Sequence, residues 1–192
     1  MTRELPLFPL ETVLFPGGPL HLRIFEPRYL DMAGSVLRAD NRFGVVAIRS
    51  GSEIGAAETF TVGTTAEIVD WQEANGLLEI STLGRDSFRI EHTSRRSDGL
   101  YIGSVELLEH LPAIPLPAPH ARLATLLETL LAELPSYASI TRAYDDATWV
   151  GARLAEILPF PVALKQAVLE TRDPLERLER IAAGLRSEPS LA

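Results

Sequence analysis

Residues 5–32 read LPLFPLETVLFPGGPLHLRIFEPRYLDM, and this stretch decides the fold. Apolar residues and prolines alternate densely in this stretch. Proline interrupts a helix and cannot donate a backbone hydrogen bond, so the proline positions exclude a continuous helix and a strand paired on both sides in the middle of a sheet. Short extended pieces are therefore predicted at 5–7, 13–15 and 20–25. We expect the first piece to be an edge strand and the last piece to be a core strand.

A tight turn and a short helix complete this opening segment. Pro16-Gly17-Gly18-Pro19 is the clearest turn of the stretch. Pro27 suits the first turn of a helix, and apolar residues then recur at helical spacing as far as about Ala39. Glu26 and Arg28 flank Pro27, and for them we predict an ion pair or a cap that locks the corner, in preference to a ligand contact.

The chain that follows has the pattern of a β-rich meander. Continuous apolar character at 43–48 predicts a buried strand, and alternation with a period of two begins at Gly63. A further strand is predicted at 100–108. Turns are predicted at 73–76, where Asn-Gly ends the connection, at 84–87 and at 94–99. Closing these strands into a small barrel would remove their exposed edges.

Beyond residue 110 the pattern becomes helical. Four prolines in 111–119 predict a stiff, extended connector that needs no hydrogen bonds of its own. Leucines at helical spacing predict a helix near 123–134, and Asp145 or Asp146 can cap the next one. Further helices are predicted at 162–170 and after the capping box that begins at Asp173. The predicted domains are 1–110, the connector 111–119, and a helical subdomain 120–192.

Composition and charge exclude several classes of protein. Of 192 residues, 46% are hydrophobic and 23% charged, which is typical of a globular chain. The net charge of −8 argues against broad nucleic-acid binding. The absence of cysteine excludes disulfides and thiolate metal sites and is compatible with a reducing cytosol. Neither a signal peptide nor a membrane span is evident, so the sequence predicts a cytoplasmic protein with no membrane partner.

The opening stretch also carries a family resemblance. The pattern L-P-L-F-P-L-x-x-V-L-F-P-G-x-x-L-x-L-x-I-F-E-P-R-Y-L-x-M resembles the start of the Lon N-terminal, or LON substrate-binding, domain family. Weaker similarity continues through 61–63, 66–68, 88–90, 157–161, 165–166 and 175–181, so that the resemblance covers nearly the whole chain. It implies an α+β fold, with an N-terminal PUA-like β-pseudobarrel that includes one short helix, followed by a C-terminal α-helical bundle.

The resemblance also implies a function. In full-length Lon proteases this region precedes an ATPase module and a serine-lysine protease module, whereas the present chain ends at Ala192. The expected activity is therefore non-catalytic binding of unfolded, extended or degron-bearing polypeptides, with a separate protease or chaperone as a possible partner. An RNA-binding PUA-like module is the alternative, and an enzyme whose site is assembled only by the fold is a third reading.

The residue types needed for catalysis or for metal binding do not occur in recognisable patterns. Lys165 is the only lysine and follows no glycine-rich loop, which excludes a phosphate-binding loop for ATP hydrolysis. It lies in the middle of a predicted helix, where a surface lysine is favoured over a serine-lysine dyad. The four histidines are scattered and form no H-E-x-x-H motif. We therefore predict no catalytic residue, no metal and no cofactor.

Aromatic side chains of the opening stretch are the candidate substrate-binding residues. Aromatic residues this close together are more often core than contact surface. An apolar groove at the junction of the two subdomains would nevertheless expose some of them to a client. The candidates are Phe8, Phe15, Phe25 and Tyr29, beside the corner residues Glu26, Pro27 and Arg28.

A second candidate surface is basic. The four arginines concerned surround the later turns and form the only concentration of positive charge in the chain; they are Arg85, Arg89, Arg95 and Arg96. A solvated turn is the default interpretation of such a group. Anion or RNA binding is the minority hypothesis, and the net negative charge of the chain makes nucleic acid the less favoured partner.

Overall fold

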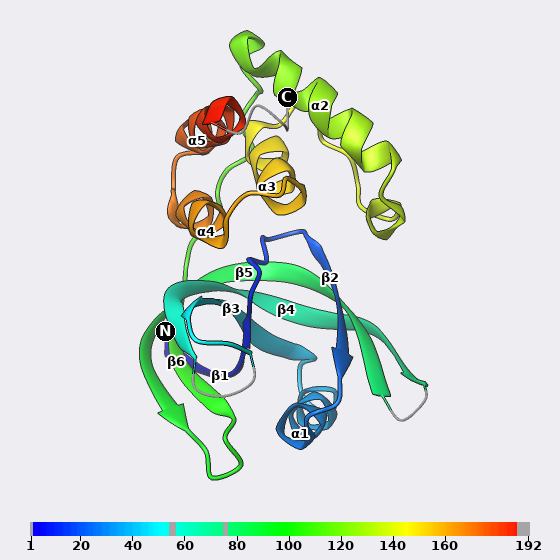
Figure 1. Cartoon of the computed structure of the whole chain (residues 1–192), viewed down its shortest axis with the longest axis vertical. Coiled ribbons are helices and arrows are strands. Elements are labelled where there is room, and N and C mark those ends of the chain that lie inside the picture. Colours follow the sequence, from blue (N-terminus) through cyan, green and yellow to red (C-terminus); the bar gives the residue numbers. More distant parts are fainter. Residues whose placement is uncertain (1, 54–56, 75–76, 188–192) are drawn as a thin grey trace. The chain divides into compact units, whose positions relative to one another are not determined.

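The computed structural model describes residues 2–53, 57–74 and 77–187. The chain divides into two compact units, Met1–Glu109 and His110–Ala192, which are described separately. Within the described residues the fold is mixed α+β, with a six-stranded sheet in unit 1 and five α-helices, of which α1 belongs to unit 1 (Figure 1). The Asn-Gly pair of the hairpin predicted at 73–76 lies outside the described residues.

The sheet of unit 1 closes on itself. Its strands are β1 Thr2–Leu10, β2 Pro19–Ile24, β3 Arg42–Ser50, β4 Glu58–Ala74, β5 Leu77–Arg95 and β6 Tyr101–Leu107. Their order is β2-β5-β4-β3-β1-β6, and β5 also pairs with β6. Five strands therefore form a closed circuit, and β2 is attached to β5 alone. The β1–β3 pair is parallel and the other pairs are antiparallel.

The predicted roles of the first two strands are wrong. β1 lies between β3 and β6 and is not an edge strand, whereas β2, predicted as a core strand, ends the sheet order. β1 tolerates its prolines because each half of it pairs on one side only. Pro6 belongs to the half paired with β6, and Pro9 to the half paired with β3. Each proline ring can then face the unpaired side, as at a sheet edge.

Gly84 has a different role from the one predicted. The turn expected at 84–87 is absent, because β5 runs without interruption from Leu77 to Arg95. The backbone of Gly84 instead binds the opening turn: it accepts a hydrogen bond from the Gly17 N–H and donates one to the Gly18 carbonyl, both at 2.8 Å. A Cβ at Gly84 would lie 2.2 Å from the Phe15 carbonyl oxygen, so the position needs glycine for close approach.

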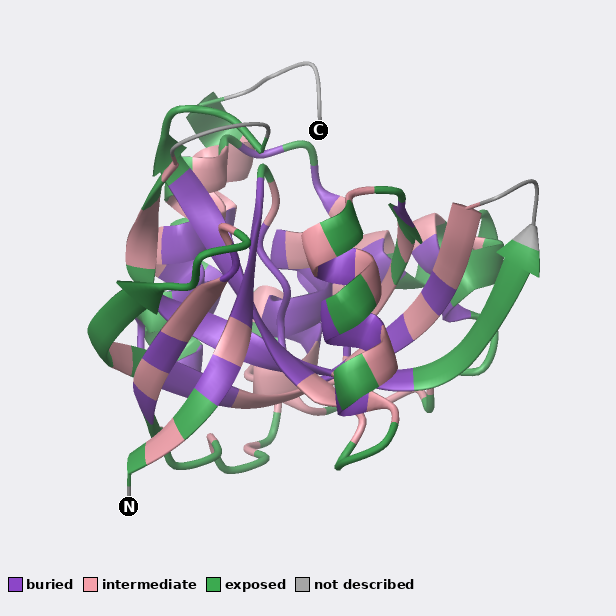
Figure 2. Cartoon of the chain, turned by 90° about the horizontal axis from the view of Figure 1, so that it is seen from below, coloured by how far each residue is buried: buried purple, intermediate pink, exposed green. Residues whose placement is uncertain are grey.

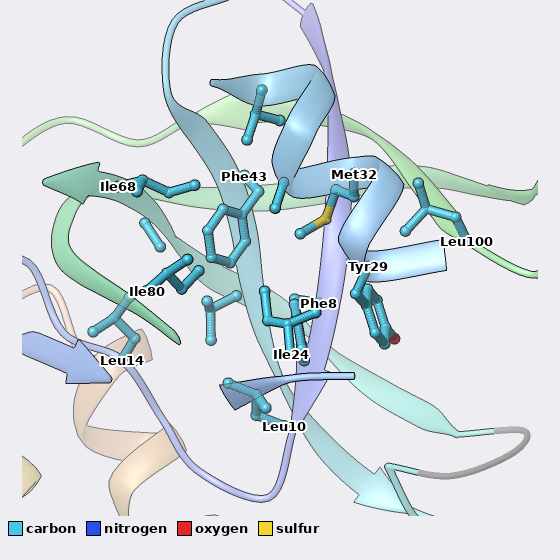
Figure 3. Packing of buried hydrophobic residues seen from close by; sticks show 14 residues of the cluster. Phe8, Leu10, Leu14, Ile24, Tyr29, Met32, Phe43, Ile68, Ile80 and Leu100 are labelled. Atoms are coloured by element: carbon cyan, nitrogen blue, oxygen red, sulfur yellow. The ribbon is translucent and has the colours of Figure 1, made fainter. Parts of the chain in front are cut away.

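Helix α1, Pro27–Val36, covers the main apolar cluster of unit 1. It begins with proline in its first turn, as predicted, and ends three residues before the predicted limit. Tyr29 and Met32 face the sheet residues Phe8, Phe43 and Ile80 in this cluster (Figure 3). The rings of Phe8 and Tyr29 stack with centroids 4.0 Å apart. Each large side chain buried here stabilises unit 1 by about 1.5–3 kcal/mol.

Unit 2 is helical where the sequence predicts helices. The elements are α2 Ala121–Ala132, α3 Ala147–Ile157, α4 Val162–Glu170 and α5 Pro174–Ser187, with short 3-10 helices at Ala118–His120 and Pro135–Tyr137. Of the two cap candidates, Asp146 is the one that accepts a hydrogen bond from the Thr148 N–H, at 2.9 Å. The Glu176–Arg180 pair predicted on the outer side of the last helix is present, at 2.7 Å.

The proline-rich connector makes hydrogen bonds to the start of α3, although the sequence predicts no need for them. The carboxylate that caps α3 also accepts from the Ile114 N–H, at 3.1 Å. The Leu116 N–H donates to the Asp145 carbonyl, and the Ala147 N–H donates to the Ile114 carbonyl. The connector is therefore held against the start of α3 and contributes to the order of unit 2.

Replacing Gly84 with alanine tests the close approach of the turn to the sheet. Gly84→Ala should lower the free energy of unfolding of unit 1 by about 1–3 kcal/mol, because the new Cβ forces the turn away from β5. Gly34→Ala in α1 is the matched control: its Cβ would lie 3.7 Å from the nearest atom, on Arg38, and should raise stability by up to about 1 kcal/mol. Urea unfolding followed by circular dichroism measures both; equal midpoints for Gly84→Ala and wild type would contradict the packing.

Candidate functional site

A cavity of about 760 Å³ lies in unit 1 beside β2. The end of β1, the whole of β2 except its first residue, the corner leading into α1, and facing segments of β4 and β5 line it. All of its described lining residues belong to unit 1, so the groove predicted at the junction of the subdomains stays a prediction. In Figure 2, β4 becomes exposed towards its end. That end of β4 contributes residues to the cavity lining.

The cavity combines an apolar floor with an aromatic rim. Leu22, Ile80 and Trp71 face one another across β2, β5 and β4, because each is the register partner of the next. Cross-strand partners lie on the same face of a sheet, so the three form one transverse row. Ile80 is buried at 2% exposure, whereas Trp71 is 55% exposed. At the end of β2, Phe25 is 61% exposed and completes the rim.

A β-bulge places Trp71 in this row. Ile68 is opposite Thr82, but Asp70 is opposite Ser81, so β4 contains one extra residue between these pairs. The extra residue reverses the alternation of side chains along β4. The sequence pattern placed Trp71 in one alternating set with Val69, opposite to Ile68, and did not single it out. The available signal was a tryptophan within the polar run Asp70-Trp-Gln-Glu73.

The structure brings three of the four candidate aromatic residues to the cavity. Phe8 and Tyr29 line its inner wall and Phe25 its rim. Phe15 is completely buried and is not among the described lining residues. Its carbonyl oxygen makes the close approach to Gly84 of β5 described above. Substrate binding by these aromatic residues stays a prediction.

The corner residues Glu26 and Arg28 form a compact polar group next to the Tyr29 ring. Arg28 pairs with Glu26 at 2.8 Å and donates a hydrogen bond to the Gly99 carbonyl at 3.3 Å. The Arg28 guanidinium also lies 4.7 Å from the centroid of the Tyr29 ring. Glu26 precedes the helix but makes no side-chain cap hydrogen bond. Of the two predicted interpretations, the ion pair is the one that the structure contains.

Acidic groups predominate around the cavity. Its described lining includes four carboxylates, of Glu26, Glu53, Asp70 and Glu79, and one guanidinium, of Arg23. Arg23 pairs with Glu79 at 3.1 Å, and Glu26 is paired with the corner arginine. Glu53 accepts from the Glu11 N–H and Asp70 from the Trp71 N–H, each at 2.9 Å. Neither of these two has a cationic partner among the residues that the structure describes.

Tyr29, a buried residue, contributes its hydroxyl to the same cavity. The residue is only 4% exposed, and burial raises the pKa of its hydroxyl, while the Arg28 guanidinium opposes part of that rise. Within the described part of the chain the hydroxyl has no hydrogen-bond partner. Figure 3 shows it at the margin of the apolar cluster, at the end of the ring that stacks on Phe8. The cavity thus has a polar group available at its inner wall.

The candidate basic residues are spread along β5 and beyond its end. Arg85 pairs with Glu67 at 2.8 Å, and this contact lowers the pKa of the Glu67 carboxyl. Arg96 pairs with Asp98 at 2.9 Å, and Arg95 stacks over the Tyr101 ring at 5.5 Å. Arg89 is exposed, and none of the four lines the cavity. Anion binding by these arginines stays a prediction.

Lys165 differs from its prediction as a surface residue. It is half-buried, its Nζ donates to the Glu156 carbonyl at 2.8 Å, and burial lowers its pKa. The contact satisfies a carbonyl in the last turn of α3, which is a structural role.

Among the described residues, no three His, Cys, Asp or Glu side chains are grouped to hold a metal ion. None of the described helices is long and apolar enough to cross a membrane.

Comparison with known proteins places the chain in one family. The model of the ATP-dependent protease La (LON) substrate-binding domain matches residues 4–186. A crystal structure of a Lon N-terminal domain protein from Xanthomonas campestris superposes with a TM-score of 0.78 and 37% sequence identity, covering 94% of this chain and 98% of that one.

Two curated relatives are longer proteins. Lon protease 2 of Myxococcus xanthus is 32% identical over 192 residues, which cover 92% of this chain and 23% of that protein. Protein cereblon of Xenopus tropicalis is 28% identical over 122 residues, which cover 61% of this chain and 26% of that protein. The chain therefore spans about a quarter of the length of the curated relatives that it matches.

Arginine-to-lysine substitutions distinguish the corner ion pair from a surface one. Arg28→Lys should lower the free energy of unfolding by about 1–2 kcal/mol, because one ammonium cannot pair with Glu26, reach Gly99 and cover the Tyr29 ring together. Arg23→Lys, at a side chain that is 77% exposed, should change it by less than about 0.5 kcal/mol. Urea midpoints measured side by side provide the test, and equal effects would contradict a structural role for Arg28.

Proposed function

Because the chain belongs to the LON substrate-binding domain family, we propose that it binds unfolded or extended polypeptides, without catalysis, in the cavity beside β2. The observation that carries this proposal is the aromatic rim. Phe25 and Trp71 are each more than half exposed, although they stand over buried apolar residues of the sheet. Exposed large apolar groups beside a cavity are typical of a surface that a partner covers.

The dimensions and chemistry of the cavity suit side chains of a polypeptide. Its volume of about 760 Å³ lies in the range of ligand pockets and exceeds that of a single side chain. An apolar client residue can pack between Phe25 and Trp71 and rest on Leu22 and Ile80. Each Å² of apolar surface removed from water contributes about 25 cal/mol to binding before the ordering costs are subtracted.

The strand order offers a way to hold the client backbone. β2 pairs with β5 on one side only, and among the described strands it has no second neighbour. An extended client can add to such an edge by main-chain hydrogen bonds and direct alternate side chains into the cavity. Main-chain hydrogen bonds of this kind depend little on the amino-acid sequence of the client, as recognition of varied unfolded clients requires.

The proposal extends to fold type and partner. The closed circuit of five strands supports classing unit 1 as a PUA-like pseudobarrel, and the helices of unit 2 support classing it as a helical bundle. The curated relatives include Lon proteases about four times as long as this chain. We therefore place the chain at the recognition step of ATP-dependent proteolysis, with delivery of the client to a protease as its outcome.

Removing the aromatic rim tests the binding site. The double variant Phe25→Ala/Trp71→Ala should bind a fluorescently labelled unfolded client, such as reduced and carboxymethylated lactalbumin, at least about tenfold more weakly than wild type. Fluorescence anisotropy measures the affinity. The melting temperature should change by less than about 4 °C, since both side chains are largely exposed.

The matched control removes an exposed apolar residue elsewhere on the same sheet. Leu107→Ala in β6 should keep wild-type affinity, because Leu107 is 41% exposed but does not line the cavity. Trp149→Phe leaves Trp71 as the only tryptophan, so its emission should shift on client binding. Equal affinity of the double variant and wild type, or an unchanged Trp71 spectrum at saturation, would place the client elsewhere.

A further inference from the structure

We infer that the cavity selects client segments in which a lysine or arginine stands beside a large apolar residue. This inference rests on the proposed function, because it specifies which polypeptides the same site prefers. It follows from three features of the cavity: an excess of carboxylates, an exposed tryptophan, and a tyrosine hydroxyl at the inner wall.

The charge balance favours a cation in the site. Two of the four lining carboxylates already have an arginine partner, whereas Glu53 and Asp70 have none among the described residues. Both are exposed, so they cost little in the empty protein. A client that covers them without supplying positive charge removes their water without compensation. A client with a basic side chain supplies charge-assisted hydrogen bonds at that point.

The exposed indole provides a second contact for the same basic side chain. Trp71 follows Asp70 directly in β4, and its ring is more than half exposed at the cavity rim. A lysine or arginine can lay its aliphatic part on this ring and bring its charge into the acidic cavity, whose lining includes Asp70. The aromatic face attracts the cation itself, so the two contacts act in the same direction.

Tyr29 supplies a polar group at the inner wall. The residue as a whole is only 4% exposed. Its hydroxyl has no hydrogen-bond partner among the described residues. It can accept a hydrogen bond from a guanidinium or ammonium that reaches inward, or donate one to a client carbonyl. The position between an apolar floor and acidic walls suits a segment that is apolar and basic at neighbouring positions.

Three matched peptides test the preference. They share one sequence with a central phenylalanine and carry lysine, glutamine or glutamate at the neighbouring position. The lysine peptide should bind about tenfold more tightly than the glutamine peptide at about 50 mM NaCl, and the glutamate peptide should bind most weakly. The lysine advantage should shrink at about 300 mM NaCl, because salt screens exposed charges. Fluorescence anisotropy gives each affinity.

Two isosteric substitutions locate the preference. Glu53→Gln/Asp70→Asn retains acceptors for the Glu11 and Trp71 N–H groups and should bring the lysine-to-glutamine affinity ratio close to one. Glu106→Gln, an exposed residue of β6 outside the cavity lining, should leave the ratio unchanged. Equal binding of lysine and glutamine peptides by wild type would overturn the selectivity and leave polypeptide binding intact. Persistence of the ratio in the double variant would also overturn it, and failure of all three peptides to bind would overturn both proposals.

Discussion

The close approach of the opening turn to Gly84 is the constraint on which the rest of unit 1 depends. Two backbone hydrogen bonds join the turn to this glycine, and the Thr64 hydroxyl donates to the Leu14 carbonyl at 2.6 Å just before it. β2 begins directly after these contacts, with Pro19 opposite Leu83. The docking thereby sets the register of β2 on β5, and through it the position of the corner, of α1 and of the cavity.

Features of the fold that depend on nearby residues could be predicted from the sequence, whereas the pairing of the β-strands could not. Proline at the start of α1 and leucine spacing in unit 2 act within a few residues, so those elements were predicted correctly. The partners of β1 are chosen by distant strands, and its prolines alone suggested an edge. Gly84 shows the same limit: a glycine required by a backbone some seventy residues earlier in the chain has the same local signature as a turn glycine.

The residues of the candidate site likewise fall into a group that could be predicted from the sequence and a group that could not. Phe25, Glu26 and Tyr29 are near neighbours in sequence, so the proline corner pointed to them together. Trp71 and Asp70 reach the cavity only because a bulge shifts the register of β4 against β5. No alternation pattern contains that shift, since the pattern predicts the opposite face. Both proposals concern this second group, which the fold adds to the aromatic residues that were singled out from the sequence.

The charges of the two units separate structural from functional roles. In unit 2, Arg177 is only 3% exposed, and it donates to the Leu169 and Thr171 carbonyls at 2.9 and 2.8 Å. Burial lowers the pKa of Arg177 to about 10. Its guanidinium is held by carbonyl groups of the chain itself. The cavity of unit 1 has the reverse character: two of its carboxylates lack a cationic partner among the described residues, and two of its aromatic side chains are more than half exposed. Covering the part of such a side chain that is still exposed is worth on the order of 1 kcal/mol, which the folded chain alone does not gain. In the proposed function that free energy is available to the bound polypeptide, and we infer that the neighbouring carboxylates favour a polypeptide with a positive charge.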